Sequence, residues 1–242
     1  MSGARTDVPP PIPPATESGS HAMTTSTSHD ATATDGWMRR FAESAHATET
    51  RLTALDQRVG DGDFGTNLTA GADAALRRLD QLPGGDTDPA APLEAAATAF
   101  LDEVGGTSGP LFGLLLQSLA AAVAGSGPTT AAYAEGVTDG LAAIRRVGDA
   151  APGDKTLVDA LTPAAEALRA TPAGTPPGQA LAAAADAAWE GVRSTARLRA
   201  RMGRSSYLGE RAEGIPDPGA VGVGLLFASA QGVVTDLDTH LG

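Results

Sequence analysis

The sequence predicts an all-α protein, folded as one antiparallel bundle or barrel of eight helices. Alanine, leucine and valine recur at helical spacing in eight segments, and few of these segments show the alternation that is typical of a strand. Clusters of glycine and proline separate the segments and leave short connections, as expected between antiparallel neighbours. Alanine is abundant and aromatic residues make up 4% of the chain, a composition that suits closely packed helices.

The predicted helices follow one another along the chain, each bounded by helix-breaking residues. They cover residues 36–55, 67–82, 92–104, 110–125, 129–147, 156–170, 178–195 and 219–240. The breakers between them are Pro83-Gly84-Gly85, Gly105-Gly106, Gly125-Ser126-Gly127-Pro128, Pro152-Gly153, Pro172 to Pro177 and Pro216 to Gly219. The longest irregular stretch, 198–218, is rich in arginine and then in glycine and proline. Long irregular segments in compact domains are often functional, so this one is a candidate for the site.

The first 35 residues have the composition of a disordered tail, and the folded domain is expected to span residues 36–242. Prolines near the start favour extended polyproline, and the Ser/Thr/Ala tract of residues 24–34 has little to bury. The tail lacks the apolar core of a secretory signal. Its segment Gly19-Ser20-His21-Ala22-Met23 resembles the scar of a cloning tag, which would make Met23 the natural start.

Composition excludes several classes of function. The chain has no cysteine, which rules out disulfides, thiolate catalysis and zinc sites of the cysteine type. A net charge of −12 argues against nucleic acid and anionic membranes as partners, and it means that a bound phosphate would need a metal, arginine or backbone donors. No run approaches the roughly 18 apolar residues of a membrane span. We therefore expect a cytoplasmic protein.

The strongest chemical signal is a run of aspartates separated by glycines. Asp56, Asp61 and Asp63 fall within eight residues, and the glycines between them let the backbone turn so that the carboxylates can converge. Clustered carboxylates favour a hard cation such as Mg²⁺ or Ca²⁺. An EF-hand is a poor alternative, because position five of such a loop would be Gly65 and position twelve lacks a glutamate. A solvated Asp-Gly turn with a helix cap remains the simpler alternative for this stretch alone.

Three further blocks could contact a phosphate, although each alone also fits an ordinary helix start or surface loop. Gly105 to Pro110 places a glycine turn and two hydroxyls before an apolar helix, where free N–H groups attract anions. Pro152 to Thr156 offers Lys155. Gly203 to Arg211 offers Arg204, whose planar group suits phosphate, and Asp217 to Ala220 makes a tight turn into the last predicted helix.

In this order along one helical domain, the blocks resemble the L subunit of dihydroxyacetone kinase. The matching residues are Leu55-Asp56 with Gly60 to Asn67, Gly105 to Leu111, Gly153 to Thr156, Gly203 to Arg211 and Asp217 to Ala220. The resemblance covers residues 36–242. It implies an eight-helix antiparallel barrel with the nucleotide bound at one end.

The same resemblance implies a set of site residues. Asp56, Asp61 and Asp63 would hold two Mg²⁺ ions against the phosphates of ADP or ATP. The residues that fall where the family contacts nucleotide are Phe64, Gly65, Thr66, Asn67, Thr107, Ser108, Gly153, Thr162, Arg204, Asp217, Pro218 and Gly219. The family commonly has histidine where this chain has Phe64, so a polar contact is lost there, while the metal ligands are intact.

The family also implies a function that needs a partner. The L subunit supplies no covalent catalyst and passes phosphate to dihydroxyacetone, which a histidine holds on a separate K subunit. The phosphate comes either from exchangeable ATP or from a phosphotransferase-system protein that rephosphorylates bound ADP, and a separate L polypeptide favours the second mode. Two alternatives stay open: a non-catalytic, nucleotide-loaded regulatory module, and a kinase subunit for another small ketose.

Overall fold

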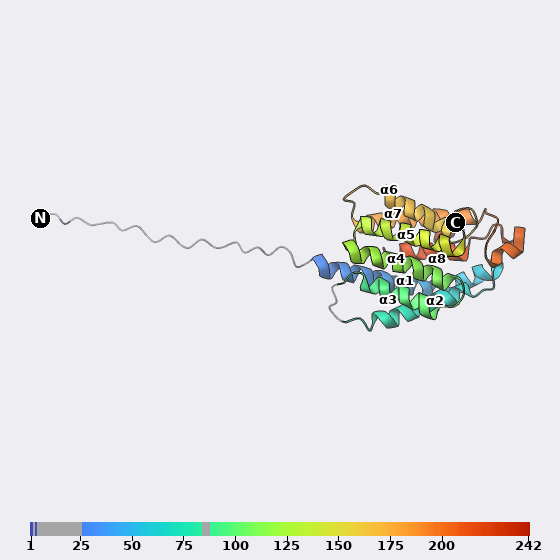
Figure 1. The fold of residues 1–242 in the computed structure, drawn as a ribbon, viewed down its shortest axis with the longest axis horizontal. Helices are drawn as coiled ribbons and strands as arrows, with labels where there is room; N and C mark the ends of the chain where they lie inside the picture. The colour runs from blue at the N-terminus through green and yellow to red at the C-terminus, as the bar shows by residue number, and fades with distance from the viewer. Residues whose placement is uncertain (2, 4–25, 84–87) are drawn as a thin grey trace.

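A computed structural model gives the fold and describes residues 1, 3, 26–83 and 88–242. The described residues form helices and loops and contain no strand. The helices are α1 (Ser26–Val59), α2 (Phe64–Leu79), α3 (Ala91–Glu103), α4 (Ser108–Ser126), α5 (Thr130–Gly148), α6 (Val158–Ala170), α7 (Pro177–Thr195), the 3₁₀ helix η1 (Arg204–Ala212), α8 (Pro218–Ala228) and α9 (Asp238–Leu241). From α1 to α8, each α-helix packs against the next, and the chain runs back and forth along the long axis (Figure 1). The predicted all-α fold is therefore confirmed.

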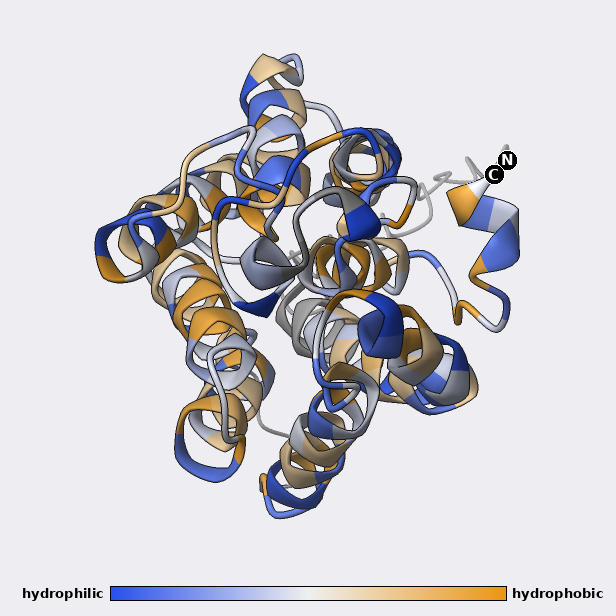
Figure 2. Ribbon diagram, turned by 90° about the vertical axis from the view of Figure 1, so that its right-hand side faces the viewer, coloured by the Kyte–Doolittle hydropathy of each residue, from blue (hydrophilic) through white to orange (hydrophobic). Residues whose placement is uncertain are grey.

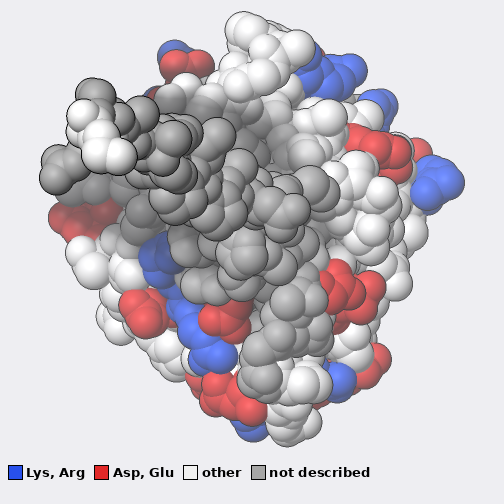
Figure 3. All heavy atoms as spheres, turned by 90° about the vertical axis from the view of Figure 1, so that its left-hand side faces the viewer, with Lys and Arg blue, Asp and Glu red and all other residues white. Residues whose placement is uncertain are grey.

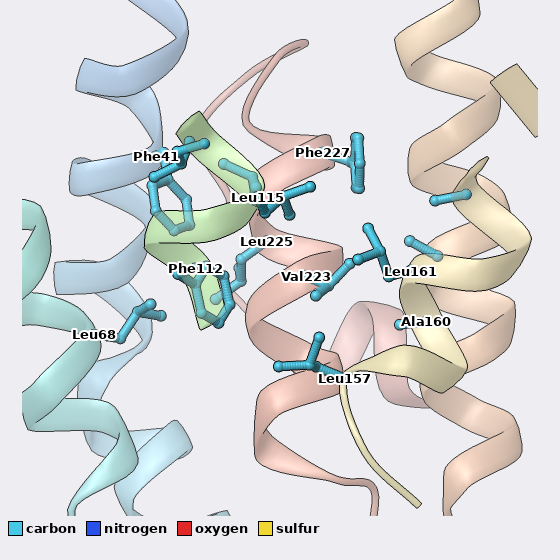
Figure 4. Packing of buried hydrophobic residues seen from close by; sticks show 14 of the residues in the cluster. Phe41, Leu68, Phe112, Leu115, Leu157, Ala160, Leu161, Val223, Leu225 and Phe227 are labelled. Carbon is cyan, nitrogen blue, oxygen red and sulfur yellow. The ribbon is translucent and has the colours of Figure 1, made fainter. Parts of the chain in front are cut away.

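Helix α8 is short and apolar on every side because it lies inside the bundle. It packs against α7, α1, α6 and α2, and nine of its eleven residues are buried. In Figure 4, Leu225 lies beside Phe112 of α4, and Val223 lies beside Leu161 of α6. A Cβ added at Gly224 would come within 2.9 Å of the Trp189 ring, so the absence of a side chain there permits the close approach of α7 and α8.

Helix α1 corrects the predicted boundary of the tail. It begins at Ser26, ten residues before the predicted start, and Thr34 is fully buried with its hydroxyl donating to the Pro89 carbonyl at 2.9 Å. The helix of the domain therefore includes residues that were predicted to lie in the tail, and Thr34 ties this part of α1 to the loop before α3. Most of the remaining predicted tail lies outside the described residues.

The last predicted helix, 219–240, is also corrected. Helix α8 ends at Ala228, and the chain then runs without helix to the short α9. Arg40 of α1 donates to the carbonyls of Ser229 and Ala230, which satisfies the end of α8. The backbone N–H of Val234 donates to the Ser44 hydroxyl at 2.9 Å. These contacts with α1 replace the hydrogen bonds of a continued helix.

Helix α4 is, by length and composition alone, apolar enough to cross a membrane. In the fold it packs between α3 and α5, and its face with Phe112, Leu115 and Leu119 is buried in the core. Its bounds lie close to the predicted helix over residues 110–125. On the end of the molecule where α1 begins, basic and acidic side chains are interspersed over the part of the surface that is coloured in Figure 3.

Candidate functional site

A cavity of about 310 Å³ opens at the end of the bundle where α1 and α5 end. Four helices begin around it, and their first residues, Phe64, Ser108, Val158 and Pro218, line it. Figure 2 looks onto this end, with the helices nearly end-on and the loops in front. The first turn of a helix carries free N–H groups and the positive end of the dipole. Four such ends around one cavity make it suitable for an anion.

The three aspartates of the predicted metal site lie together at the cavity wall. Asp56, Asp61 and Asp63 each offer a carboxylate oxygen, and these atoms all lie within 4.8 Å of one another. Asp56 is buried in the last turn of α1, whereas Asp61 and Asp63 are more accessible from the loop before α2. Three clustered carboxylates have the chemistry that Mg²⁺ prefers, and their repulsion favours a bound cation. These residues therefore fit a divalent cation.

Glycines and one backbone bond bring the aspartates together. A Cβ at Gly60 would overlap Asp56 Oδ1, so the carboxylate takes the space that a side chain would fill. Gly62 has a φ of 80°, in the left-handed region that favours glycine. The N–H of Phe64 donates to Asp56 Oδ2 at 3.0 Å, which fixes that carboxylate. The Phe64 ring turns toward Phe112, with ring centroids 6.5 Å apart, and so anchors the start of α2 in the core.

Beside the aspartates, Arg204 at the start of η1 forms an ion pair with Asp61. The neighbouring Ser205 hydroxyl donates to the Val59 carbonyl at the end of α1 at 2.7 Å. Thr107, which precedes α4, makes no side-chain cap hydrogen bond, and its hydroxyl and the first N–H groups of α4 are donors at the cavity wall. The polar half of the cavity thus offers carboxylates for a cation and a guanidinium and N–H groups for an anion.

The other half of the cavity is apolar, which the sequence analysis did not foresee. Leu111, Ile144, Ala150, Leu157 and Met202 line it. They come from α4, α5 and separate loops, and each has the pattern of an ordinary core residue in the sequence. A flat, apolar group such as a nucleobase would suit this half, because pockets combine apolar walls with a few polar groups.

Lys155 and Asp217 are charged groups at the site whose pKa values are shifted from their ordinary values. Lys155 is 1% exposed, and its Nζ donates to the carbonyls of Thr195 at 2.5 Å and Ile215 at 2.6 Å. Burial lowers the pKa of Lys155, and the negative charge of Asp217 opposes that shift. Removal from solvent raises the pKa of Asp217 to about 7, although its carboxylate accepts the N–H of Ala220 as the cap of α8. The Lys155 ammonium therefore binds backbone carbonyls, while the carboxyl group of Asp217 titrates near neutral pH.

Most of the predicted site residues line this cavity. They are Asp56, Asp61, Asp63, Phe64, Asn67, Thr107, Ser108, Arg204, Asp217, Pro218 and Gly219.

Four of the predicted nucleotide-contacting residues do not line the cavity. Gly65 packs closely against Thr53 of α1, and the Thr66 hydroxyl donates to the Asp63 carbonyl. The Gly153 N–H donates to Asp159. Thr162 has a buried hydroxyl for which the described part of the chain provides no hydrogen-bond partner.

Comparison with known proteins gives a consistent family. Residues 58–232 match the DAK2 domain. The chain is 39% identical over 197 residues to D-erythrulose kinase of Mycolicibacterium smegmatis, covering 81% of this chain and 34% of that protein. It is 38% identical over 170 residues to the ADP-binding subunit DhaL of the PEP-dependent dihydroxyacetone kinase 2 of Listeria innocua, covering 70% of this chain and 79% of the relative.

The fold is also similar to a solved structure with a bound nucleotide. The dihydroxyacetone kinase from C. freundii in complex with AMP-PNP and Mg²⁺ matches with a TM-score of 0.59 and 26% identity. The match covers 91% of this chain and 37% of that one. The present chain thus spans about a third of the length of the erythrulose kinase and of the C. freundii enzyme. The predicted family is confirmed: this chain belongs to the DAK2 domain family of the dihydroxyacetone kinases.

Proposed function

We propose that this chain is the nucleotide-binding, phosphoryl-transferring part of a kinase for a small ketose. It would hold ADP or ATP with Mg²⁺ and pass phosphate to dihydroxyacetone on a separate K-type subunit. The observation that carries the proposal is the convergence of Asp56, Asp61 and Asp63 with four helix N-termini on one cavity. Carboxylates and N–H groups attract opposite charges, and a metal nucleotide brings both to the same place.

The residues of the polar half would divide the work of binding the phosphates. Asp56, Asp61 and Asp63 would hold two Mg²⁺ ions, which neutralise charge on the phosphate oxygens when bound. The N–H groups at the start of α4, beside Thr107, would donate to those oxygens. Arg204 can turn from Asp61 to a phosphate over a short distance, because both border the cavity. Phosphoryl transfer depends mainly on such positioning and charge stabilisation, so a covalent catalyst is not required.

The apolar half would receive the base. A base between Leu111, Ile144 and Leu157 would place its sugar and phosphates toward the aspartates, because the two halves belong to one cavity. In this orientation, the partner would present its substrate to the terminal phosphate beside the aspartates.

The relatives support the partner, the substrate class and the donor. The Listeria relative is named an ADP-binding subunit of a PEP-dependent kinase, which favours tightly held ADP and a phosphotransferase-system phosphodonor, with ATP as the second donor. The similarity to D-erythrulose kinase makes erythrulose, a four-carbon ketose, a second candidate acceptor beside dihydroxyacetone. With these donors the chain would act in the cytoplasm. ADP in the native mass spectrum of the purified protein would support the mode in which ADP stays bound and is rephosphorylated by a phosphotransferase-system protein.

The test of this function is a transfer assay with and without a partner. The purified chain is mixed with either dihydroxyacetone or erythrulose and with each phosphate donor in turn, ATP or a phosphorylated phosphotransferase-system protein. Each mixture is assayed alone and then with the ketose-binding subunit of the same organism. We expect no sugar phosphate from the chain alone and steady formation once the partner is added. Robust turnover without a partner would contradict the division of labour. No turnover with the partner, despite normal nucleotide binding, would favour the nucleotide-loaded regulatory module.

A further inference from the structure

Residues 196–214 form a long connection between α7 and α8 that passes over the cavity, here called the strap. Four consecutive strap residues, 202–205, line the cavity. The strap contains Arg197, Arg199, Arg201, Arg204 and Arg211, all exposed, and residues 191–209 contain no acidic residue. The strap therefore forms one wall of the site without belonging to the helical bundle.

The tip of the strap, residues 201–209, is tied to the loops around the cavity by a few polar contacts. The N–H of Arg201 donates to the Asp154 carbonyl at 3.1 Å, and Ser205 donates to the Val59 carbonyl. Arg204 pairs with Asp61. The Arg201 side chain pairs with Asp154 at 3.5 Å. Both arginine side chains are exposed, and exposed ion pairs contribute little. The tip alone is thus weakly held.

The base of the strap is held much more firmly. Lys155 donates to the carbonyls of Thr195 and Ile215, the residues that directly flank the strap. Alongside, the N–H of Gly214 donates to the Ala196 carbonyl at 2.8 Å, and the N–H of Asp217 donates to the Thr195 hydroxyl at 2.9 Å. Hydrogen bonds from a buried charged donor are stronger than neutral ones, so Lys155 is the strongest of these contacts.

We propose that Lys155 is a positioning residue that clamps the two ends of the strap and so keeps Arg204 and Asp217 at the cavity. The ammonium group is committed to two carbonyls and is not a phosphate ligand. Lys155 has a φ of 63°, an uncommon conformation for a residue other than glycine, and the loop around it is held by Asp159, which accepts the N–H groups of Gly153 and Thr156. This inference rests on the proposed function only where it predicts an effect of Lys155 on nucleotide affinity.

Limited trypsin digestion of the ligand-free protein tests the clamp directly, because trypsin cuts after arginine and five arginines lie in the strap. Lys155→Met keeps the length of the side chain and removes the donors. We expect cleavage within the strap to become about 10-fold faster, as the loss of charged hydrogen bonds implies. Lys155→Arg, which keeps a cationic donor, should restore much of the protection.

Arg40→Met is the matched control. Arg40 also donates to two backbone carbonyls, those of Ser229 and Ala230, but it does so at the end of α8 far from the strap. It should destabilise the fold without speeding strap cleavage selectively. Equal strap cleavage in Lys155→Met and unaltered protein, or equal acceleration in both Met variants, would overturn the clamp.

Calorimetry with Mg-ADP separates this inference from the proposed function. We expect Lys155→Met to bind Mg-ADP about 10-fold more weakly and Lys155→Arg to recover affinity, as loss of a preorganised wall implies. If the unaltered protein binds no nucleotide, the proposed function fails while the trypsin result still decides the clamp.

Hydrogen exchange of the unaltered protein keeps the inference testable if Lys155→Met does not fold. The amides of Gly214 and Asp217, at the clamped base, should exchange more slowly than the amides of residues 205–209 in the tip. Equal exchange at base and tip would contradict a clamped base.

Discussion

Gly60 shows how closely the loop between α1 and α2 is fitted around the Asp56 carboxylate. A Cβ at this position would overlap Asp56 Oδ1, so Gly60→Ala should push Asp56 away from Asp61 and Asp63. We expect Mg²⁺-dependent ADP affinity to fall by about 10-fold or more, because metal ligation tolerates little displacement. Calorimetry would measure the loss.

A second glycine provides the control for that change. A Cβ at Gly125, inside α4, meets no atom within 4 Å, so Gly125→Ala should leave ADP binding unchanged. It should also raise stability slightly, because alanine favours helix. If Gly60→Ala binds Mg-ADP as tightly as Gly125→Ala, the fitted carboxylate is not needed for binding.

Asp217 predicts a specific pH dependence of stability. Its pKa is about 7 in the folded protein and 3.8 in an ordinary setting, so between these values the folded state binds one more proton than the unfolded state. The free energy of unfolding therefore falls as pH rises from about 4 to about 7. Asp217→Asn removes this dependence and keeps a residue that can cap α8.

The measurement is urea unfolding of both proteins without metal, across that range of pH. The stability of Asp217→Asn relative to the unaltered protein should rise with pH and level off above about pH 8. Asp139→Asn, at an exposed position on α5, serves as the control. A difference that stays constant with pH would mean that the Asp217 carboxyl titrates normally.

At the scale of elements, the packing of α8 against α7 depends on glycine. A Cβ at Gly224 would lie 2.9 to 3.0 Å from three ring carbons of Trp189, whose large ring is buried in the core. Gly224→Ala should therefore lower the free energy of unfolding by about 1–3 kcal/mol despite the better helix propensity of alanine. Chemical denaturation checks this. A variant as stable as the unaltered protein would show that α7 can move away at no cost.

The elements were predictable where their ends have strong local signals. Helices α4, α5 and α7 lie close to their predicted ranges because glycine and proline clusters bound them. The start of α1 was missed because its Ser/Thr/Ala tract has no apolar pattern, whereas the contact of Thr34 with Pro89 shows its place in the domain. The last helix was predicted too long because its end depends on Arg40, far away in the sequence.

At the scale of the whole molecule, the polar half of the cavity was predictable and the apolar half was not. The aspartates and the helix starts carry local motifs, so the sequence placed them together. Ile144, Ala150 and Met202 meet only because α5, the following loop and the strap converge. The clamp by Lys155 was also missed, since its acceptors are backbone carbonyls, which have no sequence signature.

The whole arrangement brings a candidate cation site and a candidate anion site together in one cavity. Asp56, Asp61 and Asp63 provide the first, and the N-termini of α2, α4, α6 and α8 provide the second. In a chain of net charge −12, a nucleotide would bind here only if the carboxylates were first neutralised by a cation. Metal and nucleotide are therefore expected to bind together.

Calorimetric titration with ADP, with and without Mg²⁺, tests that requirement most directly. It compares the unaltered chain, the double variant Asp61→Ala/Asp63→Ala and the control Asp139→Ala, which removes an exposed carboxylate outside the cavity. We expect tight binding only with Mg²⁺ in the unaltered and control proteins, and a loss of about 100-fold or more in the double variant. Binding of Mg-ADP by the double variant as tight as that of the control would contradict the central claim.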